Sequence, residues 1–336
     1  MIREAIAAVV AGKDLSEADA AATMAEIMSG EATPSQIGAL LVGLRMKGES
    51  VDEIAGMARV MREKALRVEV EGDLLDTCST GGGSFDPLNI STAAALVCAG
   101  AGVRVAKHGN RGFTSAAGAA DVLEALGAKI DLGPEQVKAC IERAGFGFLF
   151  AQAFHPAMRH AGPTRREIGI RTVFNSLGPL TNPAGARYQL LGVGEAALAP
   201  KIAQVLARLG TGRALVVHSE DGLDEVSLGA PTEVHDVEGH SVRTYHITPE
   251  EAGLGRVPLE AVRSGSAEEN AARIRSLFAG AKGPDRDYVL INAGAALVAA
   301  GRAKDVREGV GIAAEAIDSG AAGRALVAFV TASKEV

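Results

Sequence analysis

The chain has 336 residues, of which 47% are hydrophobic and 22% are charged, and its formal net charge is −7. This length and composition predict a globular protein with one large domain or two unequal ones. The acidic balance argues against a general nucleic-acid-binding protein, and no apolar run approaches the ~18 residues that a membrane-spanning helix needs.

The first 67 residues predict four short helices in a small bundle. Three pairs have the spacing of helix-capping residues: Ser16 and Asp19, Thr33 and Gln36, and Ser50 and Glu53. Apolar residues then recur at helical spacing, for example within residues 37–44. The start of the chain, residues 1–12, carries Glu4 and does not have the pattern of a signal peptide.

The chain has three cysteines, which are odd in number and far apart: Cys78, Cys98 and Cys140. Their spacing does not match that of metal ligands, and we interpret them as buried, reduced thiols. Reduced cysteines are typical of the cytoplasm, which is therefore the predicted location.

From about residue 69, strands and helices alternate, which predicts an α/β sheet with helices on both faces. The predicted strands are 103–106, 147–150, 189–192 and 214–218. The predicted helices are 92–100, 115–126, 134–143 and 198–209. Residues 232–246 predict a β-hairpin that turns at Glu238 and Gly239, and the chain from about residue 267 is predicted to be mostly helical.

A glycine-rich segment, residues 79–84 (STGGGS), follows the short apolar pair Leu74 and Leu75. Glycines let the backbone approach a ligand closely and expose its N–H groups. Ser91 or Thr92 then stands before a helical run, and a helix N-terminus suits a phosphate. These residues predict a phosphate site, with an ordinary turn and helix cap as the alternative.

Residues 107–111 (KHGNR) follow the predicted strand 103–106 and hold three side chains that can carry positive charge. Ligands of open α/β sheets bind beyond the carboxyl ends of the strands. This placement predicts a compact anion-binding site, and the alternative is a solvated charged loop. Three arginines, Arg165, Arg166 and Arg171, follow on about two predicted helical turns. Arginine suits the recognition of a carboxylate, but such a run can also form a solvated face or internal ion pairs.

Asp224 and Glu225 follow the predicted strand that ends at His218. In a loop, neighbouring carboxylates can converge on a hard divalent cation such as Mg²⁺. An acidic surface turn is the alternative interpretation.

Together these segments resemble the anthranilate phosphoribosyltransferase family, and the resemblance spans nearly the whole chain. Four ordered motifs carry it: residues 107–111 (KHGNR), 154–160 (FHPAMRH), 171–180 (RTVFNSLGPL) and 221–227 (DGLDEVS). The resemblance implies a small N-terminal α-helical domain, residues 1–68, and a large α/β domain, residues 69–336. The large domain would have a central mixed, mostly parallel sheet flanked by helices. A segment near residues 165–185 would join the two domains, and the helical domain would form a homodimer.

The resemblance also implies the reaction, which belongs to tryptophan biosynthesis. The amine of anthranilate attacks the anomeric carbon of phosphoribosyl pyrophosphate, giving N-(5-phosphoribosyl)anthranilate and pyrophosphate. The implied catalytic residues are Lys107, Asn110 and Arg165. The implied substrate-binding residues are Ser79, Gly81, Gly82, Asn89, Ser91, Thr92, Lys107, His108, Asn110, Ser115, Arg165 and Pro179. Ser91, Asp224 and Glu225 would hold one or two Mg²⁺ per subunit.

The chain departs from the family pattern in the glycine-rich segment, which commonly reads Gly-Thr-Gly-Gly-Asp. Here Ser79 replaces the first glycine and Gly83 replaces the aspartate, while Asp86 lies close by in the sequence. The stretch after Arg111, often rich in serine, keeps the hydroxyls of Thr114 and Ser115. A Ser-Thr-Gly-Gly loop is also found in pyrimidine nucleoside phosphorylases. Three alternatives therefore remain: such a phosphorylase, a phosphoribosyltransferase with another acceptor, and a non-catalytic relative that binds nucleic acid.

Overall fold

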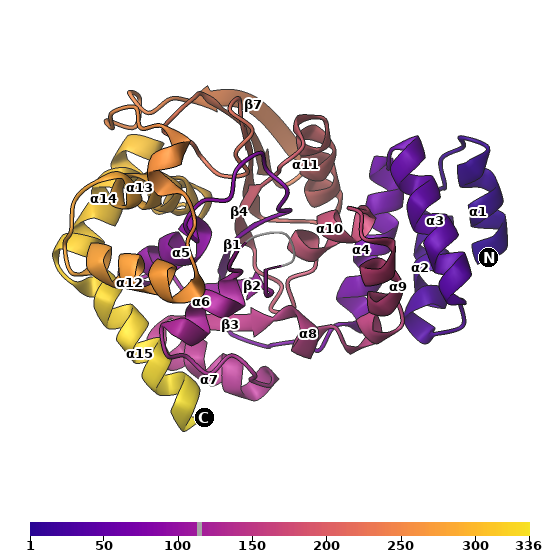
Figure 1. The fold of residues 1–336 in the computed structure, drawn as a ribbon, viewed down its shortest axis with the longest axis horizontal. Helices are drawn as coiled ribbons and strands as arrows, with labels where there is room; N and C mark the ends of the chain where they lie inside the picture. The colour runs from indigo at the N-terminus through magenta and orange to yellow at the C-terminus, as the bar shows by residue number, and fades with distance from the viewer. Residues whose placement is uncertain (113–115) are drawn as a thin grey trace.

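The computed structural model describes residues 1–112 and 116–336, and a seven-stranded sheet lies at its centre (Figure 1). The strands are β1 (Leu75–Ser79), β2 (Val105–Gly109), β3 (Phe146–Phe150), β4 (Tyr188–Gly192), β5 (Arg213–Ser219), β6 (Thr232–Glu238) and β7 (Ser241–Ile247). Their order is β3-β2-β1-β4-β5-β6-β7, in which the first five strands are parallel and β6 and β7 are antiparallel. The predicted mixed, mostly parallel sheet is thus confirmed.

Four helices form the predicted N-terminal bundle: α1 (Ile2–Val10), α2 (Glu17–Ser29), α3 (Pro34–Lys47) and α4 (Val51–Lys64). All three predicted caps are present, because the side chains of Ser16, Thr33 and Ser50 accept hydrogen bonds from the backbone three residues later. Figure 1 shows this bundle, with the N-terminus, at the opposite end of the molecule from the C-terminal helices.

Two short helices from later in the chain pack on this bundle. Helix α9 (Gly162–Ile168) contacts α3, and α10 (Val173–Leu177) contacts α3 and α4. Val173, Phe174 and Leu177 share one hydrophobic cluster with the bundle. The segment near 165–185 therefore contacts the helices of the N-terminus, whereas the domain boundary at residue 68 stays a prediction.

The sheet is covered on both faces because alternate residues of each strand point to opposite sides. Leu190 and Leu215 join one hydrophobic cluster, and their neighbours Leu191 and Val216 join the other. The first cluster includes residues of α5 (Ile90–Gly100), α13 (Pro284–Ala299) and α15 (Ala321–Glu335). The second includes α11 (Ala199–Arg208) and the N-terminal bundle. The remaining α-helices are α6 (Ala119–Ala125), α7 (Pro134–Ala144), α8 (Ala151–Phe154), α12 (Ala267–Phe278) and α14 (Val306–Asp318).

Three elements differ most from their predicted bounds. Strand β2 extends to Gly109, because it pairs with β3 from Val105 as far as Gly109. Helix α6 begins at Ala119, where the Asp121 carboxylate accepts a hydrogen bond from the Gly118 backbone and caps the helix. Helix α5 begins at Ile90, which places Ser91 and Thr92 inside its first turn.

The close packing of α2 on α4 leads to a stability prediction. A Cβ atom at Gly56 would lie 2.3 Å from the carbonyl oxygen of Glu17, so Gly56→Ala is expected to destabilise the protein by about 2 kcal/mol or more. Gly311 is exposed on α14 with open space around it, and Gly311→Ala is expected to stabilise by about 0.5–1 kcal/mol. Urea unfolding of both variants measures the change in the free energy of unfolding. A change of the same sign and similar size in the two variants would contradict the prediction.

Candidate active site

The loops that follow β1, β4 and β5 are joined at the carboxyl edge of the sheet. The Thr80 N–H donates to the Gly192 carbonyl at 2.9 Å, which ties the glycine-rich segment to the end of β4. The Ser84 N–H donates to the Gly222 carbonyl at 3.0 Å, and the Ser84 hydroxyl donates to the Asp221 carbonyl at 2.9 Å. The structure therefore brings the predicted phosphate and metal segments together at the edge where ligands of such sheets bind.

Glycine is required within residues 79–84 for two reasons. Gly81 and Gly82 have φ angles of 66° and 78°, which L side chains rarely adopt. A Cβ atom at Gly82 would also lie 2.3 Å from the guanidinium of Arg171. Arg171 donates a hydrogen bond of 2.9 Å to the Thr80 carbonyl and so fixes the loop.

The interpretation that placed Arg171 on one helix with Arg165 and Arg166 was wrong. Helix α9 ends at Ile168, because Gly169 adopts a left-handed conformation with φ 69° and turns the chain. Arg171 can therefore reach the glycine-rich segment. Its only signal in the sequence is that it begins the 171–180 motif.

Lys107 lies inside β2 and is almost fully buried, with 1% of its surface exposed. Its ammonium donates hydrogen bonds to the Thr77 carbonyl and, at 3.2 Å, to the Ser91 hydroxyl. Burial lowers the Lys107 pKa, and the nearby carboxylates of Asp76 and Glu225 oppose this effect. The Lys107 ammonium is therefore fixed between the middle of β1 and the first turn of α5.

Asp224 and Glu225 are both buried in the loop after β5. Burial raises the Glu225 pKa to about 8, with a further contribution from the Asp224 carboxylate, while Lys107 and Ser91 lower it. Burial also raises the Asp224 pKa, and the Ser79 hydroxyl and Arg171 oppose the rise. Two adjacent carboxylates whose charge is not fully compensated fit a divalent cation.

Gly83, where the family commonly has aspartate, lies against this acidic pair. A Cβ atom there would be 2.9 Å from a carboxylate oxygen of Asp224 and 3.0 Å from the Gly222 carbonyl. The Asp86 carboxylate accepts a hydrogen bond of 2.8 Å from the Ala116 backbone. Its charge also raises the Asp224 pKa. Asp86 is therefore close enough to act on Asp224 electrostatically, and its role as a replacement carboxylate stays a prediction.

His108 and His155 form a buried pair whose ring centroids are 5.1 Å apart. The His108 Nδ1 is 3.1 Å from the Gly178 carbonyl, which requires a proton on that nitrogen. Both Nε2 atoms are buried and have no hydrogen-bond partner among the described residues. Burial lowers the His108 pKa to about 3 and the His155 pKa to about 4.

These lowered pKa values predict a pH-dependent stability. Between about pH 4 and 6.5 the unfolded chain binds a proton at His155 that the folded chain does not, so stability falls as the pH falls through this window. Between pH 7 and 5 we expect His155 to contribute a loss of about 2 kcal/mol. Urea unfolding at both pH values should show a smaller loss for His155→Gln, whereas His246→Gln, at an exposed site on β7, should match the parent. An equal pH dependence in the two variants would contradict the prediction.

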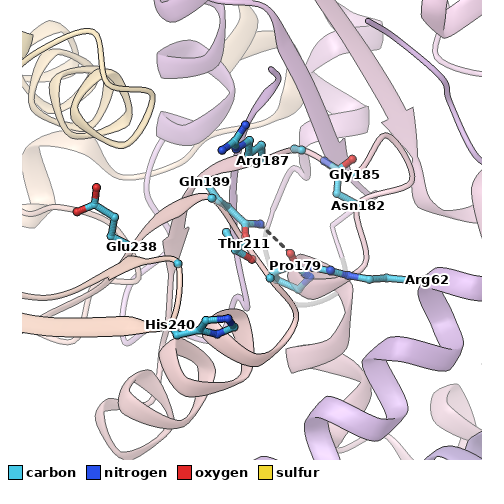
Figure 2. A pocket seen from close by; sticks show the side chains of 13 residues that line it. Arg62, Pro179, Asn182, Gly185, Arg187, Gln189, Thr211, Glu238 and His240 are labelled. Carbon is cyan, nitrogen blue, oxygen red and sulfur yellow. Dashed lines mark hydrogen bonds between the residues drawn. The ribbon is translucent and has the colours of Figure 1, made fainter. Parts of the chain in front are cut away.

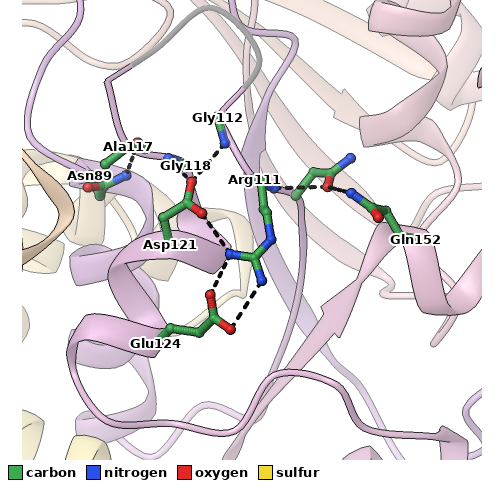
Figure 3. Close-up of polar contacts among 9 residues, drawn as sticks. Asn89, Arg111, Gly112, Ala117, Gly118, Asp121, Glu124 and Gln152 are labelled. Atoms are coloured by element: carbon green, nitrogen blue, oxygen red, sulfur yellow. Dashed lines mark hydrogen bonds and ion pairs between the residues drawn. The ribbon is translucent and has the colours of Figure 1, made fainter.

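Arg111 does not belong to the predicted anion site, and this part of the prediction was wrong. Its guanidinium forms ion pairs with Asp121 and Glu124, as Figure 3 shows. These pairs engage both terminal nitrogens of Arg111 and turn it toward α6. Asn110, by contrast, lies at the carboxyl end of β2, and its side-chain oxygen accepts a hydrogen bond of 3.3 Å from Gln152.

Arg165 lies on α9 with its guanidinium 5.0 Å from the centre of the Phe174 ring. Burial lowers its pKa to about 10, and among the described residues it has no carboxylate within ion-pair distance. Its charge therefore lacks a counter-ion, which fits the predicted contact with a substrate carboxylate. Pro179 lies five residues after Phe174, and its carbonyl accepts a hydrogen bond of 2.7 Å from Gln189.

The remaining predicted substrate-binding residues lie around α5. Asn89 precedes the helix and donates a hydrogen bond of 2.9 Å to the Ala117 carbonyl (Figure 3). Thr92 is fully buried, and its hydroxyl has no partner in the described part of the chain. Ser115 lies outside the described residues, so its predicted role is not tested.

The fold and the joined loops define a glycosyltransferase of two parts. Residues 71–323 match the model of the glycosyl transferase family a/b domain, and residues 3–65 match that of the family's helical bundle domain. The anthranilate phosphoribosyltransferase of Chloroflexus aurantiacus is 56% identical over 335 residues, which cover 99% of each chain. The chain belongs to the anthranilate phosphoribosyltransferase family.

Solved structures agree with this family. The Thermus thermophilus anthranilate phosphoribosyltransferase is 48% identical, with a TM-score of 0.93 over 98% of this chain and 99% of that one. The Saccharomyces cerevisiae enzyme in complex with PRPP and Mg is 28% identical, with a TM-score of 0.92 over 100% of this chain and 98% of that one. These relatives favour the transferase over the phosphorylase and the nucleic-acid-binding alternatives. Among the described residues, no helix is both long and apolar enough to cross a membrane.

Proposed function

We propose that this chain transfers the phosphoribosyl group of phosphoribosyl pyrophosphate to the amine of anthranilate in tryptophan biosynthesis, with Mg²⁺. The observation that carries the proposal is the convergence of Ser91, Lys107, Asp224 and Glu225 at one edge of the sheet. This edge combines a buried cation, two buried carboxylates and the first turn of a helix. Such a set suits a ligand with several phosphates and a divalent cation.

The donor would lie along the glycine-rich segment, with its phosphates against the backbone N–H groups of that segment and the first turn of α5. Lys107 would stabilise the negative charge that develops on the departing pyrophosphate. Ser91, Asp224 and Glu225 would hold one or two Mg²⁺ per subunit, and the ion would neutralise part of the pyrophosphate charge. In the described part of the chain, no group of three or more His, Cys, Asp or Glu side chains is arranged to hold a metal ion, so donor phosphates and water would complete the coordination.

Anthranilate would lie between this edge and the α9–α10 segment. Arg165 would bind its carboxylate, and His108 and Asn110 would line the junction between the two substrates. The anthranilate amine attacks the anomeric carbon, so the protein needs no nucleophile of its own and contributes mainly by positioning. Closure of the helical bundle toward the sheet would exclude water from the ribosyl donor.

A direct assay tests the proposal. Incubation with anthranilate, phosphoribosyl pyrophosphate and Mg²⁺ is expected to remove anthranilate fluorescence, and the chain has no tryptophan to interfere. Omission of Mg²⁺, or addition of a chelator, is the matched control and is expected to stop the reaction. If anthranilate fluorescence does not change with both substrates and Mg²⁺ present, the proposed function is wrong.

We also propose that two chains form a homodimer through the helical bundle. Val10 on α1 and Met46 on α3 are 73% and 83% exposed, and these two helices pack on each other. Large apolar side chains at such exposure favour a protein contact. Met46→Glu is expected to shift the chain from dimer to monomer in sedimentation velocity, whereas Val327→Glu on α15 should leave the dimer intact. A wild-type monomer, or an unchanged Met46→Glu dimer, would exclude this interface.

A cytoplasmic location is a further part of the proposal. All three cysteines are buried and unpaired. Free thiols are typical of proteins that work in a reducing compartment.

A further inference from the structure

A cavity of about 680 Å³ lies at the amino ends of β4 and β5, the edge of the sheet opposite to the candidate active site (Figure 2). Arg62 at the end of α4, Pro179, and the turn between β6 and β7 contribute to its walls. The cavity therefore contacts the helical bundle, the segment after α10 and the sheet at one place. None of the carboxylates or the lysine of the candidate active site lines it.

Arg62 carries a positive charge into this cavity without a matching negative one. Its Nε donates a hydrogen bond of 2.6 Å to the Leu180 carbonyl, and one Nη donates to the Leu209 carbonyl at 3.4 Å. In the part of the chain that the structure describes, no carboxylate lies within 4.0 Å of its guanidinium. Burial lowers the Arg62 pKa, and the two backbone carbonyls that accept its hydrogen bonds carry no full negative charge.

Two further side chains in the cavity wall can bind an anion. Arg187 is largely exposed, and its only ion pair in the described chain is a long one of 3.4 Å to Asp73. His240 uses its Nδ1 for the Ala207 carbonyl at 3.1 Å, which leaves Nε2 for another partner. Glu238 is the one acidic side chain among the lining residues, and Figure 2 shows its carboxylate on the other side of the cavity from Arg62.

We propose that this cavity is a binding site for a small oxyanion, a carboxylate or a phosphate, that pairs with the Arg62 guanidinium. The planar fork of arginine matches two oxygens of such a group, while the Arg187 guanidinium supplies further positive charge and the His240 Nε2 supplies a further hydrogen-bonding atom. The ligand would contact α4 and the segment around Pro179 together. That segment begins at Gly178, whose carbonyl is 3.1 Å from the His108 Nδ1. The proposed anion site and the candidate active site therefore share one stretch of backbone.

Equilibrium dialysis of the full-length chain tests the proposal with two labelled probes, inorganic phosphate and succinate. The wild-type chain is expected to bind at least one of them at this site, and the probe that binds identifies phosphate or carboxylate as the preferred group. If neither probe binds at millimolar concentration, the proposal is wrong.

Variants separate this cavity from the active site, which also binds anions. Arg187→Glu and Arg62→Gln are each expected to weaken binding at one site per chain by about ten-fold or more. Arg302→Glu, an exposed arginine outside the cavity, is the matched control and should bind as the wild type does. Arg62 also bonds two backbone carbonyls, so if Arg62→Gln fails to fold, the exposed Arg187 variant decides. Unchanged binding by folded Arg187→Glu would overturn the proposal.

Discussion

Replacing Asp224 and Glu225 together with alanine is expected to lower kcat by about 1000-fold or more, even at high Mg²⁺ concentration. The two carboxylates are buried side by side, and burial raises the pKa of each, so the site pays a desolvation cost that a bound cation offsets. Without them the departing pyrophosphate would lose the charge compensation that the proposed Mg²⁺ supplies. Steady-state kinetics over a range of Mg²⁺ concentrations measures this loss.

The matched control for this experiment lies in the same loop. Glu220 is an exposed carboxylate four residues before Asp224, and Glu220→Gln should keep the wild-type dependence on Mg²⁺. A single Glu225→Gln change keeps the side-chain volume and should still require much more Mg²⁺. Full activity of the double alanine variant would show that the metal is bound elsewhere.

Arg165→Ala is expected to raise the KM for anthranilate by about 10- to 100-fold and to leave the KM for phosphoribosyl pyrophosphate within about three-fold. The Arg165 guanidinium lies over Phe174, and its pKa falls to about 10 because it is buried without a counter-ion. A buried guanidinium without a counter-ion is stabilised strongly when a substrate carboxylate binds beside it. Initial rates with each substrate varied in turn provide the test.

Arg166 gives the control for the Arg165 experiment because it is the next residue of the same helix and its side chain is exposed. Arg166→Ala should leave both KM values close to those of the wild type. Equal losses for donor and acceptor in Arg165→Ala would contradict a contact with the anthranilate carboxylate.

Much of the fold could be predicted because its signals are local. Each capping pair, such as Ser50 and Glu53, lies within four residues, and the hydrogen bonds involved depend only on the start of one helix. The alternation of short apolar runs with helical patterns likewise predicted the parallel sheet. The Asp224 and Glu225 pair was found in the same way, from its place after a predicted strand.

The errors concern pairings between distant residues. Lys107 was predicted to lie just beyond the end of its strand, since charged residues are rare inside buried strands. In the structure Lys107 lies within β2, where the Thr77 carbonyl and the Ser91 hydroxyl accept hydrogen bonds from its ammonium. Arg111 has the same charge and lies four residues later, but Asp121 and Glu124 pair with it. No local pattern separates these two cations. The difference depends on which strand and which helix lie beside each of them.

Strand order has a consequence for how the chain folds during its synthesis. Strand β1 is central in the sheet, and its Leu75 pairs with Tyr188 of β4. The ribosome adds about 110 more residues between these two positions, which takes roughly 5–20 s. For that interval one edge of a strand that is buried in the folded protein has no neighbour and can pair with another nascent chain. The four helices of the bundle are complete before β1 appears and pack on one another, so they can begin to fold before α9, α10 and α11 are available to cover them. Translation speed between residues 80 and 188 should therefore influence the yield of folded enzyme.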